Sequence, residues 1–188
     1  MHLNTVLDSE KVANRTLNLF SLYVDFPAGL RAKWAAGLVT RRAAKYWEVA
    51  GQVWKLDSVI TAGSLRNLIG GEAAQADVLV VAFSSLDEPE QAVIDWLESL
   101  APARQTDPAA GGLLVGLLGD DENWVGSKDA MVKRLAQIAR GRNMDFAWHW
   151  MGRDAKEDPE WLADRVEQLL DRKQSARFFE SQTGLALL

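Results

Sequence analysis

The sequence contains no cysteine, which excludes disulfide bonds, thiolate catalysis and cysteine-ligated metal sites. Only two histidines occur among the 188 residues, His2 and His149, so a nucleophile–histidine dyad or a histidine-rich metal site lacks candidate members. Positive charge is also in the minority, because 21 lysines and arginines stand against 26 acidic residues, giving a formal net charge of −5. A mildly acidic surface repels nucleic-acid phosphates and anionic lipid, so we expect neither nucleic acid nor a membrane as a partner.

Long hydrophobic runs are missing as well. The longest apolar stretches, Val78–Phe83 and Leu113–Leu118, are far shorter than the roughly 20 residues of a membrane-spanning helix. Near the amino terminus, Asp8, Glu10 and Asn14 interrupt the apolar run that an export signal would need. We therefore expect a cytoplasmic protein.

What the sequence does contain is five short apolar segments separated by stretches with helical periodicity. Two of the segments are apolar on both faces, as the central strands of a parallel sheet must be when helices cover both sides. The second segment alternates with polar residues and is typical of an edge strand. The five predicted strands are Leu17–Phe26, Val53–Ile60, Asp77–Ser84, Gly112–Leu118 and Met144–Met151.

This alternation predicts one three-layer α/β/α sandwich around a five-stranded parallel sheet. Right-handed crossovers leave few topologies, and for this size we expect the order 2-1-3-4-5 of flavodoxin-like and receiver-like folds. The chain is long enough for one well-filled core. We assign residues 1–16 to an amino-terminal extension, 17–173 to the flavodoxin-like domain and 174–188 to an apolar carboxyl-terminal tail.

The predicted site lies at the carboxyl ends of the strands, deepest where the strand order reverses between the first and third strands. The candidate residues of this crevice are Asp25, Ser84, Ser85, Asp87, Asp120 and Arg153. Asp25 and Asp120 would be the ligands of Mg²⁺ if a metal binds, because this cation prefers oxygen. The alternative is that these residues serve only as turn and cap residues, which gather wherever strands end.

Two known uses of this fold can be compared with the sequence. Flavodoxins bind the flavin phosphate in a hydroxyl- and glycine-rich loop after the first strand, whereas DFPAGL at this position has no hydroxyl, so we predict no FMN and no other cofactor. Receiver domains of two-component signalling resemble the chain in length and rhythm. Receiver domains carry an acidic pair after the first strand, a phosphoaccepting aspartate at the end of the third, a Ser/Thr after the fourth and a Lys after the fifth. At these four positions this chain has Asp25 alone, Ser84–Ser85, Gly119–Asp120 and Gly152–Arg153.

Four further segments are VWKLDSV, LRNLIGGEAAQADVLVVAFSS, VIDWLESL and NMDFAWHWM. In them the chain resembles a family of small uncharacterised bacterial proteins that carry a W-[KR]-[FL]-D strand and a later aromatic–histidine strand. The match spans most of residues 17–151. The resemblance implies a flavodoxin-like or receiver-like fold and a bacterial source, and it implies no chemistry.

Several other side chains suggest packing or association. We expect His149 to be a packing histidine, and most of the eight tryptophans to belong to the core, among them Trp34, Trp96, Trp148, Trp150 and Trp161. The cations of the first helix, Arg31, Lys33, Arg41, Arg42 and Lys45, are expected on its solvent face. The apolar tail residues should be buried against a second copy, which predicts a homodimer; they are Phe178, Phe179, Leu185, Leu187 and Leu188.

These features favour a non-catalytic, receiver-like signalling or protein-interaction module that lacks the phosphoacceptor. The alternative is an enzyme or binding protein for a nucleotide or another phosphate-containing small molecule. In that case Asp25 would be a base or Mg²⁺ ligand, Ser84 and Ser85 would contact phosphate or hydroxyl groups, and Asp120 would be a second acid. A third reading is nucleic-acid binding through the basic first helix.

Overall fold

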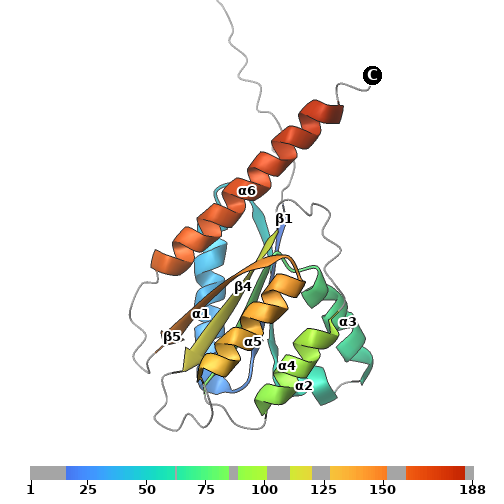
Figure 1. Cartoon of the computed structure of the whole chain (residues 1–188), viewed down its shortest axis with the longest axis vertical. Coiled ribbons are helices and arrows are strands. Elements are labelled where there is room, and N and C mark those ends of the chain that lie inside the picture. Colours follow the sequence, from blue (N-terminus) through green and yellow to red (C-terminus); the bar gives the residue numbers. More distant parts are fainter. Residues whose placement is uncertain are drawn as a thin grey trace, which may run out of the picture.

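The computed structural model describes residues 16–61, 63–84, 89–100, 111–119, 128–151 and 160–184. Its centre is one sheet of five parallel strands in the order β2-β1-β3-β4-β5, as predicted (Figure 1). The strands are β1 (Thr16–Tyr23), β2 (Glu48–Lys55), β3 (Val78–Phe83), β4 (Gly112–Gly119) and β5 (Met144–Met151). The helices are α1 (Phe26–Ala43), α2 (Leu56–Thr61), α3 (Gly63–Ala74), α4 (Pro89–Ser99), α5 (Lys128–Gly141) and α6 (Glu160–Gly184).

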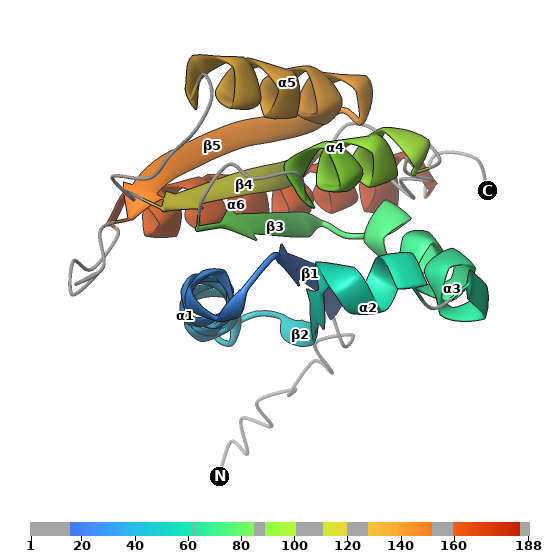
Figure 2. The same cartoon turned by 90° about the horizontal axis from the view of Figure 1, so that it is seen from below.

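Helices cover both faces of the sheet, and each face has its own apolar core (Figure 2). One core joins the sheet to α1 and α6, and the other joins it to α2, α3, α4 and α5. Every residue of β3 and β4 is buried, which explains why these two segments are apolar without alternation. None of the helices in the described ranges combines the length and the apolarity that crossing a membrane requires.

The predicted position of the second strand is wrong. The strand is Glu48–Lys55, and most of the segment assigned to it, from Leu56 onward, is helix α2. Parallel pairing with β1 runs from Thr16 opposite Glu48 to Tyr23 opposite Lys55. Beyond Lys55 the neighbouring strand has ended, so the chain has no partner with which to continue the sheet. Leu56 and Val59 instead point into the core at helical spacing.

The inward face of α1 also differs from the prediction. The recurrence of Leu30, Trp34 and Leu38 at a spacing of four residues predicts that all three lie inward, but 55% of Leu30 is exposed. The buried stripe consists mainly of small side chains, namely Ala28, Ala32, Ala35, Leu38, Val39 and Ala43. Alanines allow the helix backbone to approach the sheet closely. The predicted inward face is therefore right for Leu38, which is buried, and wrong for Leu30.

The aromatic residues of β5 divide between the two faces of the sheet. His149 is half-buried and stacks on Trp161 of α6 with ring centroids 5.2 Å apart, so it is a packing histidine, as predicted. Trp148 contacts Trp150 on the opposite face but is exposed, contrary to the expected core position. β5 pairs only with β4 among the described strands, and the outer side of such an edge position has less chain to cover it.

Helix α6 packs on the sheet along its first half, where Leu162, Val166 and Leu169 are buried at helical spacing. The helix then continues without interruption through residue 173, where the domain was expected to give way to a tail, and ends at Gly184. Figure 1 shows its carboxyl-terminal part extending past the end of the sheet.

Asp77 joins α6 to the amino-terminal edge of the sheet. Its Oδ2 accepts a hydrogen bond of 2.8 Å from the backbone N–H of Asn18 in β1, and its Oδ1 lies 2.7 Å from Nζ of Lys173 in α6. The backbone N–H of Asp77 donates to the carbonyl of Asn18, and its carbonyl accepts from Leu113 of β4. The carboxylate and the ammonium are only 20% and 13% exposed. One aspartate therefore connects β1, β4 and α6 at the start of β3.

Replacing Lys173 by methionine should lower the free energy of unfolding by about 1–3 kcal/mol, because the poorly hydrated carboxylate of Asp77 loses its ionic partner. The matched control is Arg172→Met in the same helix turn. Arg172 pairs with Asp145 at 2.6 Å, but both side chains are more than 40% exposed. This control should cost less than about 0.5 kcal/mol. Urea unfolding measures both values, and equal losses would contradict the assigned role of Asp77.

Candidate functional site

Asp25 lies between β1 and α1, at the edge of the sheet where the strands end. Its backbone is extended, and its Oδ1 accepts a hydrogen bond of 2.9 Å from the N–H of Ala28, so Asp25 is the N-cap of α1. Aspartate is a favoured residue at this position because it satisfies an N–H group that has no partner within the helix. Pro27 follows in the first turn, where its missing N–H costs nothing. The local sequence therefore fixes where the carboxylate sits.

Ser84 follows β3 and meets Asp25 at this edge. Its hydroxyl donates a hydrogen bond of 2.6 Å to Oδ1 of Asp25, although 59 residues separate the two along the chain. The pairing follows from the strand order, because β1 and β3 are parallel neighbours and their carboxyl ends emerge together. The prediction that Asp25 and Ser84 share one rim is confirmed. Ser84 is only 5% exposed, so its hydroxyl belongs to the interior rather than to an accessible surface.

Arg31 is the member of this cluster that sequence reasoning missed. It was expected on the solvent face of α1 but is only 9% exposed. Its Nη1 donates to Oγ of Ser84 at 3.0 Å and to the carbonyl oxygen of Phe83 at 3.3 Å. The positions of the alanines could have predicted that Arg31 is buried. Position 31 follows Ala28 by three residues and precedes Ala35 by four, so it lies on the buried side of the helix.

Gly119, the last residue of β4, limits the space on the far side of Ser84. A Cβ atom at this position would collide with the backbone of Ser84 and would lie 3.0 Å from Nη1 of Arg31. Glycine is therefore required here for the close approach of β4 to the end of β3. Its absent side chain leaves the room that the guanidinium of Arg31 occupies.

Together these side chains form what we call the Asp25–Ser84–Arg31 cluster. The serine hydroxyl bridges a carboxylate and a guanidinium, so one negative and one positive group are held in the same small volume. The carboxylate already occupies the positive end of α1, where an anionic ligand would otherwise bind. Pro27 removes one of the N–H groups that could face such a ligand. The arrangement thus joins the ends of β1 and β3 to α1.

The remaining predicted crevice residues, Ser85, Asp87, Asp120 and Arg153, lie outside the described residues. The same holds for Leu185, Leu187 and Leu188 and for the side chains of Phe178 and Phe179, whose backbone belongs to α6. Within the described ranges, no group of three or more acidic or histidine side chains could hold a metal ion. Asp25 is the one member of the predicted Mg²⁺ pair that the structure places.

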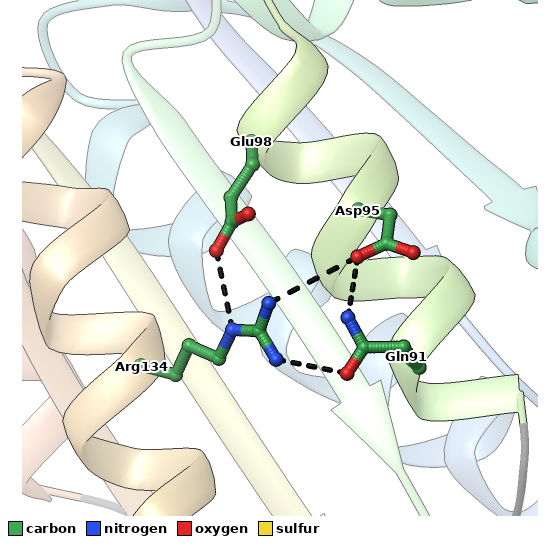
Figure 3. Close-up of polar contacts among 4 residues, drawn as sticks. All are labelled: Gln91, Asp95, Glu98 and Arg134. Atoms are coloured by element: carbon green, nitrogen blue, oxygen red, sulfur yellow. Dashed lines mark hydrogen bonds and ion pairs between the residues drawn. The ribbon is translucent and has the colours of Figure 1, made fainter.

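A second polar cluster, on the outside of the molecule, was not predicted. Arg134 of α5 lies 2.8 Å from Oε1 of Gln91 and 3.2 Å from Oε1 of Glu98, and the more distant Asp95 lies at 3.9 Å (Figure 3). Gln91 also contacts Asp95 within α4. The spacing of 91, 95 and 98 on one helix face was the available signal. All three charged side chains are exposed, so this cluster connects α4 to α5 through contacts that water screens.

Comparisons with known proteins add little beyond the fold. No family model matches the chain, and no curated protein matches it in sequence. Among solved structures, the chain is similar to a flavodoxin of Streptococcus pneumonia TIGR4, with 10% sequence identity and a TM-score of 0.43 over 84% of this chain and 97% of that chain. The assignment of a flavodoxin-like fold rests on the parallel sheet and its strand order.

The Asp25–Ser84–Arg31 cluster gives a direct test of its structural role. Ser84→Ala removes the bridging hydroxyl and should lower the free energy of unfolding by about 1–3 kcal/mol, because a carboxylate and a guanidinium each lose a buried partner. The control is Ser21→Ala in β1, whose buried hydroxyl has no hydrogen-bond partner among the described residues. That variant should stay within about 0.5 kcal/mol of the parent or be more stable. Denaturant unfolding of both proteins would show whether the hydroxyl of Ser84 is indispensable.

Proposed function

We propose that this chain is a non-catalytic protein-interaction or signalling module of receiver-like shape, and that it forms a homodimer through the carboxyl-terminal part of α6. The observation that carries the proposal is the Asp25–Ser84–Arg31 cluster, because it stands at the reversal of strand order, where folds of this type bind their ligands. Among the described residues at that place, Asp25 and Arg31 both bind the hydroxyl of Ser84.

The cluster argues against phosphoryl chemistry in two ways. A phosphate group at this place would have to approach the carboxylate of Asp25, which caps α1. The two negative charges would repel each other. At the end of β3, where a receiver domain carries the phosphoaccepting aspartate, this chain has Ser84, whose hydroxyl is already donated to Asp25. A receiver-like shape without phosphotransfer is consistent with both observations.

Helix α6 supports the part of the proposal that concerns self-association. Its 25 residues correspond to a length of about 37 Å, and Leu170 is its last buried apolar residue among the side chains that the structure describes, which reach to residue 176. A stretch of roughly ten residues that leaves the body of the domain is too short to be a stable helix alone in water. This stretch carries Phe178 and Phe179 in its sequence and is followed by LALL. Pairing with the same stretch of a second copy would stabilise the helix and bury these apolar residues.

The cellular setting belongs to the same proposal. A cytoplasmic location agrees with the lack of cysteine, and the resemblance to small bacterial proteins suggests a bacterial source. Neither point specifies a reaction, and we propose no cofactor.

Removing residues 174–188 should convert a dimer into a monomer, because the proposed contact lies in that stretch. Sedimentation equilibrium of the full and shortened chains would measure this change directly. Phe178→Ser together with Phe179→Ser should weaken the dimer in the same way, whereas Ser175→Ala, at an exposed position of the same helix, should leave it intact. A full chain that is monomeric at high concentration would rule out the self-association.

The main alternative is a protein that binds a phosphate-containing small molecule near Asp25. Thermal unfolding with candidate ligands distinguishes this alternative from the proposal. A ligand that binds only the native state raises the melting temperature, because at a concentration 100 times its Kd it adds about 2.7 kcal/mol to the free energy of unfolding. We expect FMN, nucleotides, sugar phosphates and Mg²⁺ to leave the melting temperature unchanged. A shift that is present in the parent chain and lost in Asp25→Asn would favour the alternative.

A further inference from the structure

The outer face of α1 combines exposed apolar side chains with cations that have no carboxylate partner among the described residues. Phe26 is 76% exposed and Leu30 is 55% exposed, and the half-buried Trp34 follows at the same spacing of four residues. Residues four apart lie on one face of a helix, so these three side chains form a single apolar strip. Phe26 and Leu30 are the most exposed large apolar residues of α1, and they stand on successive turns. Such a strip in a water-soluble domain marks a binding surface.

The same face becomes basic toward the carboxyl end of the helix. Lys33 and Arg41 lie beside the strip, and Arg41 extends back along the helix, since its Nη1 would be 3.4 Å from a Cβ placed at Gly37. Lys45 follows in the next turn, with its Nζ 4.8 Å from the ring centroid of Tyr46. Within the described part of the chain, no carboxylate lies within ion-pair distance of Lys33 or Arg41.

The charge of α1 is opposite to that of the rest of the chain. Residues 26–47 contain five lysines and arginines and no acidic residue. Two of the five are occupied within the domain, because Arg31 belongs to the Asp25–Ser84–Arg31 cluster and Arg42 pairs with Glu167 at 3.2 Å. The remainder of the chain has 16 lysines and arginines against 26 acidic residues. A favourable position at the negative end of the helix accounts for Arg41 but not for Lys33, in the second turn.

We infer that the outer face of α1 binds an acidic, amphipathic segment of a partner protein. Apolar side chains of that segment would cover Phe26, Leu30 and Trp34, and its carboxylates would lie over Lys33, Arg41 and Lys45. This inference rests on the proposed function, because it names the partner surface of the interaction module.

The charge of the whole chain favours a peptide segment over a membrane or a nucleic acid. A bilayer or a duplex presents a wide array of negative charge, which would also face the acidic remainder of the molecule and be repelled by it. A single segment about 27 Å long, the length of α1, contacts only the basic and apolar strip. Charge complementarity is therefore limited to the outer face of α1, and it favours a ligand no larger than that face.

The test uses the full chain and a fluorescein-labelled peptide of about 18 residues, matched to the length of α1, with leucine at every fourth position and glutamate beside it. Fluorescence anisotropy should show saturable binding that weakens with added salt, and a scrambled peptide or one with lysine in place of glutamate should not bind. Phe26→Ser with Leu30→Ser should raise the Kd about tenfold or more, and so should Lys33→Glu with Arg41→Glu.

Matched controls come from other exposed positions. Leu68→Ser on α3 removes an apolar side chain that is 61% exposed, and Lys133→Glu on α5 reverses an exposed cation. Both should leave the Kd within about twofold of the parent value. Far-ultraviolet circular dichroism and urea midpoints near the parent values would show that the α1 variants remain folded.

Two outcomes would overturn the inference. In the first, the peptide does not bind, or it binds the α1 variants as well as the parent. In the second, phosphatidylserine vesicles or duplex DNA bind through Lys33 and Arg41 while the peptide does not, which would assign the face to a lipid or nucleic-acid surface. Neither outcome affects the mass of the dimer in solution, so a failure here is distinguishable from a failure of the α6 contact.

Discussion

The hydroxyl of Ser84 donates to Asp25 and accepts from Arg31, and this one bridge fixes three elements relative to one another. Asp25 also caps α1, so the loop after β1, the end of β3 and the first turns of α1 are joined at one point. The bridge requires that β1 and β3 be parallel neighbours and that β4 approach closely at Gly119. The orientation of α1, including which side of it faces the solvent, follows from this arrangement.

The proposed function rests on the groups that the bridge engages. Asp25 and Ser84 lie where related architectures bind their ligands, and here they join β1, β3 and α1. Two other features of the described chain support the proposals, the outer face of α1 and the end of α6. One carries apolar and basic side chains in an otherwise acidic chain, and the other extends as a helix beyond its own sheet. Both features agree with the proposed role in protein interaction.

The two edges of the sheet are stabilised by different means. At the carboxyl edge, a neutral hydroxyl separates the carboxylate of Asp25 from the guanidinium of Arg31. At the amino edge, Asp77 contacts Lys173 directly and also accepts a backbone hydrogen bond. Burial strengthens both contacts, since water screens them less than it screens exposed pairs such as Arg134 with Glu98 (Figure 3).

The amino-acid sequence by itself determined the class of fold, the strand order and the meeting of Asp25 with Ser84. Apolar runs without alternation indicate central parallel strands, because the burial of both faces is a local signal. The first strand was predicted to continue through Phe26, but β1 ends at Tyr23 and Asp25 caps α1. Only the tertiary structure decided that β2 ends at Lys55 and that Arg31 is buried. The end of a strand depends on the length of its neighbour, and the buried side of an alanine-rich helix depends on what it packs against. Neither is a property of the segment alone.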